Sequence, residues 1–136
     1  MTSPDTPPAT GRLPDASIHI TQALIDRYAA LSGDFNPIHV DPVAGAASAF
    51  GSTIAHGCIP LEPVFQSLLR WSGCDRLPPR TQVRLRYRAP SRPGDTVRAE
   101  VWQTGPATDG TQSLAFRCLN QHGQLVLDGE ADYPTT

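Results

Sequence analysis

Lysine is absent from this 136-residue sequence, so its eleven basic side chains are all arginines. The net charge of −2 argues against the strongly basic surface of a general nucleic-acid-binding protein. A membrane-spanning helix needs a run of about 18 apolar residues, and no apolar run in the sequence approaches that length. The opening MTSPDTPPATGRLPDAS lacks the basic start and apolar stretch of a secretory signal. We therefore expect a cytoplasmic protein that binds neither nucleic acid nor membrane.

Cysteine is scarce as well, with Cys58, Cys74 and Cys118 as the three examples. Their odd number and wide spacing do not fit a disulfide framework. No Cys-x-x-Cys pair indicates a zinc or thiol redox site. We expect buried or partly buried free thiols in a reducing compartment, with no metal and no redox cofactor.

The length fits one domain. Residues 1–16 are rich in Pro, Thr, Ser and Asp and have too little apolar surface to order themselves, so we predict a flexible tail. Residues 17–134 show no repeat and no second change of composition, which predicts a single domain. A domain of this size can bury more of its surface by pairing, so we expect a homodimer.

Two segments have the apolar period of a helix. The first is predicted over residues 22–32, between an N-cap at Thr21 and a terminating Gly33. The second, over residues 58–72, is predicted to be a buried central helix that Gly73 ends. Its apolar stripe consists of Leu61, Val64, Phe65, Leu68 and Leu69.

Between these helices, Pro37 blocks helix continuation and indicates a structured loop over residues 33–41. A short helix is predicted over residues 42–48.

The remaining segments alternate with a period of two, as strands do. Strands are predicted at 18–20, 82–89, 97–101, 111–119 and 124–133. Four consecutive strands after one buried helix predict an α+β fold, in which an antiparallel sheet wraps around the central helix.

Three polar groups of different chemistry, Asp34, Asn36 and His39, lie within six positions. A carboxylate with little water around it can act as a base, and a neutral imidazole nearby can hold a water or pass a proton. An Asp close to a helix end also commonly bonds local backbone. The three residues alone leave both interpretations open.

The order of residues in LSGDFNPIHV, with AHG at 55–57, resembles the MaoC-like, R-specific enoyl-CoA hydratase family. The family signature is a helix ending in S-G-D-x-N-P-h-H, where h is aliphatic, and residues 32–39 match it. The small residues at 46–48 also fit, as does His56-Gly57 ahead of a long apolar helix. The resemblance covers about residues 17–134. It implies the hot-dog fold and an enzyme that adds water to an enoyl thioester or removes it from a 3-hydroxyacyl thioester.

The resemblance also implies roles. Asp34 would activate the water, and His39 would share that water and help deliver a proton. Asn36 would orient the loop, and the backbone N–H of Gly57 would bond the thioester carbonyl. A donor at a helix N-terminus suits the negative charge that builds on this carbonyl. An ordinary loop glycine is the alternative for Gly57, and we place Cys58 among the substrate-binding residues.

The residues after Gly57 depart from the family pattern. Pro63 removes a backbone donor, so the helix start is expected to be irregular or delayed. Ser67 or Gln66 is expected to replace the hydroxyl that supports the aspartate in the family. Glu62 has three interpretations: a rim position that reaches water, a lining of the acyl pocket that selects a polar or cationic acyl group, or the base or nucleophile of a thioester hydrolase. That hydrolase and a noncatalytic hot-dog subunit are the alternatives to the hydratase.

Arg84, Arg86 and Arg88 share one face of a predicted strand. They form a solvated face or bind an anionic carrier, either the phosphates of coenzyme A or the acidic surface of an acyl carrier protein. His39-x-Asp41 with a later histidine is also a pattern of iron sites. The oxygenases that use such sites are jelly rolls without a buried helix, so we expect no metal.

Overall fold

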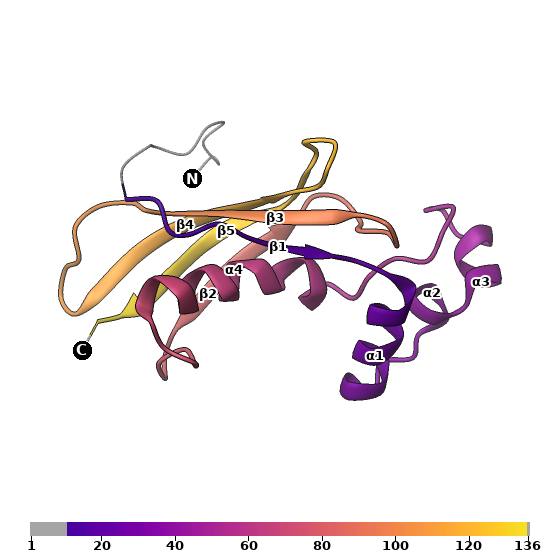
Figure 1. Ribbon diagram of the computed structural model, residues 1–136, viewed down its shortest axis with the longest axis horizontal. Helices are drawn as coiled ribbons and strands as arrows, with labels where there is room; N and C mark the ends of the chain where they lie inside the picture. Colours follow the sequence, from indigo (N-terminus) through magenta and orange to yellow (C-terminus); the bar gives the residue numbers. More distant parts are fainter. Residues whose placement is uncertain (1–10, 136) are drawn as a thin grey trace.

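The computed structural model describes residues 11–135 and shows one antiparallel sheet with a long helix against one of its faces (Figure 1). The sheet has five strands in the order β1-β3-β4-β5-β2. The expected antiparallel sheet around a central helix is confirmed. The strands are β1 (Ala16–His19), β2 (Gln82–Tyr87), β3 (Thr96–Gln103), β4 (Thr111–Leu119) and β5 (Leu125–Pro134), and the helices are α1 (Gln22–Ser32), α2 (Pro37–Val40), α3 (Pro42–Ala47) and α4 (Cys58–Ser72).

The core lies between α4 and the sheet. Val64 and Leu68 of α4 are fully buried, and so are the inward-facing Val97 of β3 and Phe116 of β4. Removing each such side chain from water contributes about 1.5–3 kcal/mol. The apolar stripe predicted for the central helix is therefore the surface that holds the sheet, and the helix ends at Gly73 in the left-handed conformation, as predicted.

Pro63 lies inside α4 without delaying its start, so the expectation of an irregular beginning was wrong. The helix is continuous from Cys58, and the ring of Pro63 is among the fully buried side chains. Packing of this ring in the core offsets the loss of one helical N–H donor.

The segment predicted as a structured loop contains the short helix α2. Pro37 cannot continue a helix, but its fixed φ suits the first helical position. The side chain of Asn36 caps this turn by accepting a hydrogen bond from the Ile38 N–H at 3.2 Å. In Figure 1, α1, α2 and α3 lie together beyond one end of the sheet.

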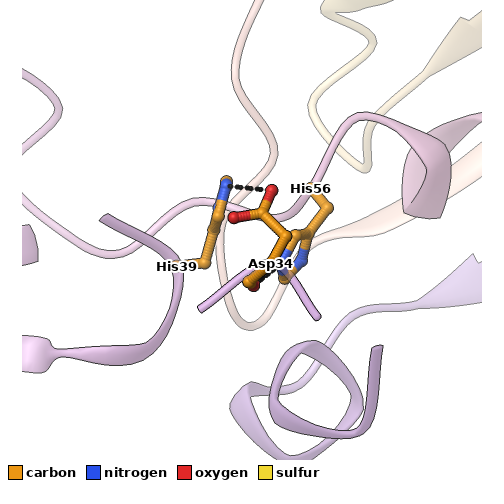
Figure 2. A group of neighbouring side chains, drawn as sticks. All are labelled: Asp34, His39 and His56. Atoms are coloured by element: carbon orange, nitrogen blue, oxygen red, sulfur yellow. Dashed lines mark hydrogen bonds and ion pairs between the residues drawn. The ribbon is translucent and has the colours of Figure 1, made fainter. Parts of the chain in front are cut away.

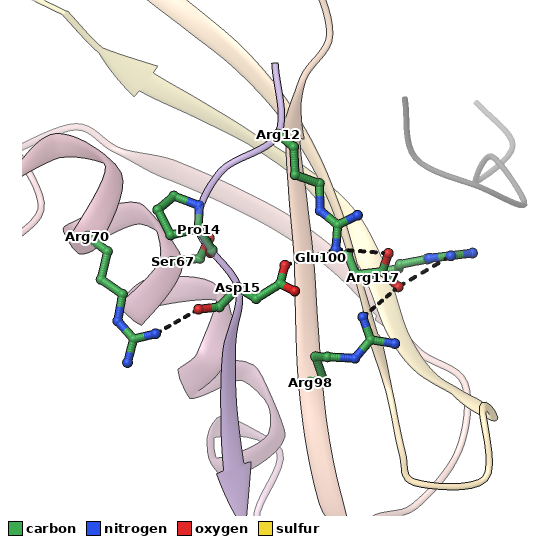
Figure 3. A network of polar contacts seen from close by, with 8 residues as sticks. All are labelled: Arg12, Pro14, Asp15, Ser67, Arg70, Arg98, Glu100 and Arg117. Carbon is green, nitrogen blue, oxygen red and sulfur yellow. Dashed lines mark hydrogen bonds and ion pairs between the residues drawn. The ribbon is translucent and has the colours of Figure 1, made fainter. Parts of the chain in front are cut away.

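The folded part begins earlier than the expected boundary at residue 17. Residues 1–10 of the expected tail lie outside the described residues, but Leu13 is buried and β1 begins at Ala16. The side chain of Ser67 donates to the Pro14 carbonyl at 2.6 Å, and Arg70 donates to the Asp15 carbonyl at 2.7 Å (Figure 3). These bonds from α4 hold the segment before β1 against the body of the domain.

Two further observations concern the described part of the chain. No helix there has both the length and the apolar character that crossing a bilayer requires. All three cysteines are free, but the expectation that they are buried or partly buried was wrong for Cys58 and Cys74, which are exposed, and Cys118 alone of the three is buried.

Candidate active site

The loop that carries the predicted catalytic residues starts where α1 ends. Gly33 has a φ of 80°, which glycine adopts without strain, and the chain leaves the helix there. The side chain of Gln22 on α1 donates to the His39 carbonyl at 2.8 Å and accepts from the Thr53 hydroxyl at 2.7 Å. One side chain of α1 therefore ties α2 to the segment that leads into α4.

Asp34 and His39 face each other, as Figure 2 shows. Asp34 Oδ2 lies 3.8 Å from His39 Nε2, and the two side chains are 53% and 13% exposed. The gap is too long for a direct hydrogen bond and suits a bridging water. His39 Nδ1 donates to the Ile54 carbonyl at 2.8 Å, so the neutral ring presents a lone pair at Nε2.

Asp34 also has the local backbone role that the sequence left open. Its Oδ1 accepts a hydrogen bond from the Asn36 N–H at 3.2 Å. The second oxygen remains directed at His39. The two interpretations of Asp34 are therefore compatible, because the backbone bond orients the carboxylate. Asn36 contributes to this loop through its own N–H and through its cap of α2.

His56, which entered the sequence analysis only as part of the family resemblance, lies in contact with both catalytic candidates. Its Nε2 donates to the Asp34 carbonyl at 2.9 Å. Its ring stacks on that of His39, with centroids 3.9 Å apart. The residue is 4% exposed. Its ring also lies against that of Tyr28, at a centroid distance of 4.7 Å and a tilt of 56°.

Gly57 directly precedes α4 and has helical dihedral angles. Among residues 11–135, its N–H has no acceptor, as is usual for the first donors of a helix. A methyl group added at Gly57 would lie 2.5 Å from the Tyr87 hydroxyl oxygen, so only glycine fits without a shift. The free N–H of Gly57 and the phenol hydroxyl of Tyr87 therefore lie next to each other. Both are beside the pair formed by Asp34 and His39, which is called the dyad below.

Tyr87 lies in the strand predicted over residues 82–89, and no local pattern in the sequence marks it as a site residue. Its proximity to Gly57 arises because the end of β2 lies beside the start of α4. Partial removal from water, followed by the proximity of Cys58, raises the pKa of Tyr87. The hydroxyl thus keeps its proton and remains a hydrogen-bond donor.

Tyr28 and Cys58 form a second polar pair next to the dyad. A side-chain hydrogen bond with Cys58 is the main cause that raises the pKa of Tyr28, and burial adds to it. Both residues line a hollow of about 330 Å³ between α1 and α4. The hollow is mostly apolar, as small-molecule sites usually are. Its lining consists of Ile18, Leu24, Arg27, Tyr28, Leu31, Cys58, Ile59, Glu62 and Phe65.

Glu62 therefore lines the hollow, which sequence alone left undecided. Its Oε1 accepts a hydrogen bond from Gln66 at 2.7 Å. Gln66 is thus engaged away from Asp34, and Ser67 donates to the Pro14 carbonyl. The expectation that one of these two supports the aspartate was wrong.

Arg84, Arg86 and Arg88 come from β2 and the residue after it. Val83 and Leu85 pack against the core, so Arg84 and Arg86 project from the opposite face of the sheet. The acidic partners on β5 come close to two of the three. Arg84 lies 3.0 Å from Asp132, and Arg88 lies 3.0 Å from Asp128. Arg86 is exposed and forms no ion pair with any residue between 11 and 135.

Ligand atoms of Asp34, His39 and His56 lie within 4.8 Å of one another, a spacing that metal sites also show. The two imidazole planes, however, are inclined by only 25° in a stack. Their lone pairs lie in the ring planes and so run side by side rather than converging on one ion. Asp41 caps α3, since its Oδ1 accepts from the Val43 and Ala44 N–H groups at 3.0 and 3.4 Å, and it is not one of the three residues whose ligand atoms lie close together.

Comparisons with known proteins agree with this arrangement. The family model described as MaoC like domain matches residues 5–123. The (R)-specific enoyl-CoA hydratase of Aeromonas caviae is 37% identical over 114 residues, which cover 80% of this chain and 81% of that protein. The 3-hydroxyacyl-thioester dehydratase Y of Mycobacterium tuberculosis is 34% identical over 136 residues, and the match spans 46% of its length.

Solved structures show the same architecture. The Aeromonas caviae (R)-hydratase involved in PHA biosynthesis superposes with a TM-score of 0.79 at 29% identity, covering 92% of this chain and 94% of that one. The unliganded R-hydratase PhaJ1 of Pseudomonas aeruginosa gives 0.75 at 28% identity, covering 92% and 81%. The expected hot-dog fold is thereby confirmed, and with a family match over most of its length this chain belongs to the MaoC-like family.

Proposed function

We propose that this protein adds water to a 2-enoyl thioester to give a 3-hydroxyacyl thioester and catalyses the reverse dehydration. The observation that carries the proposal is the 3.8 Å gap between Asp34 Oδ2 and His39 Nε2, beside the free N–H of Gly57. A water beside the line that joins these two atoms can bond to both, and the Gly57 N–H can donate to a carbonyl oxygen.

The polar groups suit conjugate addition. The water oxygen bonds to C3 of the enoyl group while one of its protons passes to Asp34 or His39, and a proton is delivered to C2. His39 can accept at Nε2 because its Nδ1 proton is held by the Ile54 carbonyl. Positioned acid–base groups of this kind contribute about 10²–10⁴ in rate.

As the water oxygen bonds to C3, negative charge accumulates on the carbonyl oxygen of the thioester. The Gly57 N–H and the Tyr87 hydroxyl are the adjacent donors that would stabilise this enolate-like state. The hollow between α1 and α4 begins at Cys58, the residue after Gly57, and would receive the acyl chain. Continuity between donor and hollow supports one binding mode for both ends of the acyl group.

For the carrier, we propose that Arg86 meets an anionic group of coenzyme A or of an acyl carrier protein. Arg84 and Arg88 already have carboxylate partners on β5, and their charges are partly neutralised. Replacing Arg86 with Ala should raise the KM for the carrier-linked substrate and leave kcat unchanged. An unchanged KM at low salt would contradict this assignment.

We also propose a homodimer. Leu31, Phe35 and Tyr87, which carry large apolar surface near the dyad, are 84%, 58% and 54% exposed. The edge strand β2 adds unpaired backbone groups on one side. Light scattering after size exclusion should give twice the mass of one chain. For Phe35→Asp, the measured mass should fall toward that of a single chain. A wild-type monomer at micromolar concentration would refute the pairing.

The proposed cytoplasmic location rests on the three free cysteines, which suit a reducing compartment. Fractionation of cells that express the full chain tests it, and recovery from another compartment would contradict it.

The activity is tested with crotonyl-CoA, 3-hydroxybutyryl-CoA and butyryl-CoA, using the change in enoyl absorbance and the release of free thiol. Wild type should interconvert the first two, and Asp34→Asn and His39→Ala should each lose about 10²–10⁴ in kcat. Asp75→Asn, at an 89% exposed carboxylate, serves as control. Release of thiol from butyryl-CoA that depends on Glu62 would indicate a hydrolase instead. No turnover of any thioester would favour a noncatalytic subunit.

A further inference from the structure

The hollow between α1 and α4 contains a carboxylate that the hydration chemistry does not use. Aliphatic and aromatic side chains form most of its wall, yet Glu62 lines it at half-buried depth. Gln66 donates to Glu62 Oε1 at 2.7 Å, while Oε2 has no partner among residues 11–135. The carboxylate is thus held in place with one oxygen open.

An open carboxylate oxygen is unfavourable opposite an alkyl chain. A chain that fills the hollow would remove water from Oε2 and offer no hydrogen bond in return. An acyl group with a donor at that depth would replace the lost water. The hollow therefore discriminates by the chemistry of the acyl tail as well as by its length.

The position of Glu62 fixes where that donor must be. Cys58 and Glu62 are four residues apart on α4, so they share a face and lie roughly 6 Å apart along the axis. Cys58 adjoins the Gly57 donor at which the thioester carbonyl would bind. Six ångström is the length of a few carbon–carbon bonds, which places the donor near the sixth carbon of the acyl chain.

Arg27 is the other charged residue of the lining, on the α1 side. It is exposed, whereas Glu62 is half-buried, and no ion pair joins the two. Arg27 can keep its water when the hollow fills, so Glu62 dominates the cost of an apolar ligand.

From these observations, the geometry points to Glu62 as a specificity residue that selects acyl groups carrying a hydroxyl or amino group near the end of a six-carbon chain. This inference rests on the proposed function, because it takes the hollow as the acyl site. It deepens that function by naming a substrate class.

Binding of saturated thioesters tests the inference without turnover. Calorimetry with hexanoyl-CoA, 6-hydroxyhexanoyl-CoA and 6-aminohexanoyl-CoA should show about tenfold or tighter binding of at least one donor-bearing ligand by wild type. Glu62→Leu should abolish or reverse this preference. Glu62→Gln should retain a preference for the hydroxyl and lose one for the ammonium group, which separates the two donors.

Arg27→Met is the matched control, since it removes a charge from the same hollow, and the preference should survive it. Equal or tighter binding of hexanoyl-CoA by wild type, or a preference that persists in Glu62→Leu, would overturn the inference. Hydration of crotonyl-CoA by the same preparation is measured separately. Hydration without a Glu62-dependent preference refutes only the specificity, and the preference without hydration refutes only the proposed activity.

Discussion

The imidazole ring of His56 lies face to face with that of His39, with centroids 3.9 Å apart and planes inclined by 25°. The same His56 donates to the Asp34 carbonyl at 2.9 Å. One buried side chain thus fixes the ring of one catalytic candidate and the backbone of the other. The 3.8 Å gap that would hold the water depends on both contacts.

Replacing His56 with Ala should therefore lower kcat for crotonyl-CoA hydration by about 10²-fold, because small displacements of reacting groups carry such costs. KM should change little, since His56 is not part of the hollow. Steady-state kinetics with circular dichroism as a folding check measures this.

Two partial replacements separate the contacts of His56. Gln can keep a donor near the position of Nε2, and Phe can keep the ring stack. Each should recover part of the lost kcat. If His56→Ala retained full kcat in a folded protein, the ring would serve only the turn before Gly57.

Gly57→Ala tests the donor at the start of α4. The added methyl would lie 2.5 Å from the Tyr87 hydroxyl oxygen, so either the N–H or the phenol must move. We expect a loss of about 10²–10³ in kcat, the usual cost of one such donor. Gly57→Ala/Tyr87→Leu should regain the melting temperature, because the clash is gone, but only part of the activity. Full activity of Gly57→Ala alone would exclude this donor.

The sequence predicted the elements whose ends are marked by local chemistry. Thr21, Gly33 and Gly73 set the limits of α1 and α4 through side-chain and left-handed caps, and these interactions need no distant partner. The central helix and the order of polar residues in the 34–39 loop were predicted for the same reason.

Contacts between distant segments could not be predicted in this way. The stack of His56 on His39 and the approach of Tyr87 to Gly57 depend on how the sheet and helices pack. The partners of Arg84 and Arg88 are Asp132 and Asp128 on β5, which lie 48 and 40 residues away in the sequence. The prediction of an irregular helix start at Pro63 failed for a related reason. Burial of the Pro63 ring in the core outweighs the local preference of proline against positions inside a helix.

The three cysteines should differ in reactivity toward iodoacetamide. Burial raises the pKa of Cys118 from 9.0 to about 12, so this thiol stays protonated and unreactive in the folded protein at pH 8. Cys58 and Cys74 are exposed and should be alkylated. Mass spectrometry of tryptic peptides reads each site, and labelling of Cys118 at pH 8 without unfolding would contradict its burial.

The same thiol has a consequence for stability. Because the folded-state pKa is the higher one, the contribution of Cys118 is complete below about pH 9 and is lost as the pH rises toward about 12. Replacing Cys118 with Ala should flatten the alkaline decline of the melting temperature. An equal decline in both proteins would assign it to other groups.

Occupancy of the hollow should protect one exposed cysteine and not the other. Cys58 lines the hollow between α1 and α4, whereas Cys74 follows the far end of α4. Saturating 3-hydroxybutyryl-CoA should slow alkylation of Cys58 by about tenfold or more, as expected at a ligand concentration well above Kd. Cys74 provides the internal control. Equal rates at Cys58 with and without ligand would place the acyl group elsewhere.

Glu100 on β3 is a position where loss of one carboxylate should lower stability strongly. It is 4% exposed and lies 3.2 Å from Arg12, 3.3 Å from Arg98 and 3.3 Å from Arg117 (Figure 3). Removing one partner of a buried ion pair costs about 3–5 kcal/mol, because the remaining charge is left without compensation. The arginines are 17–47% exposed, which screens part of this penalty.

Glu100→Gln should therefore lower the free energy of unfolding by about 2–3 kcal/mol in urea titrations. Glu130→Gln is the matched control on the same sheet, since its 40% exposed carboxylate meets Arg84 only at 3.8 Å, and it should change stability by less than about 0.5 kcal/mol. Arg12 also anchors the segment before β1, so the Glu100 variant should expose that segment to proteases. Equal stability of the two variants would show that water solvates the three arginines as favourably as their ion pairs with Glu100 stabilise them.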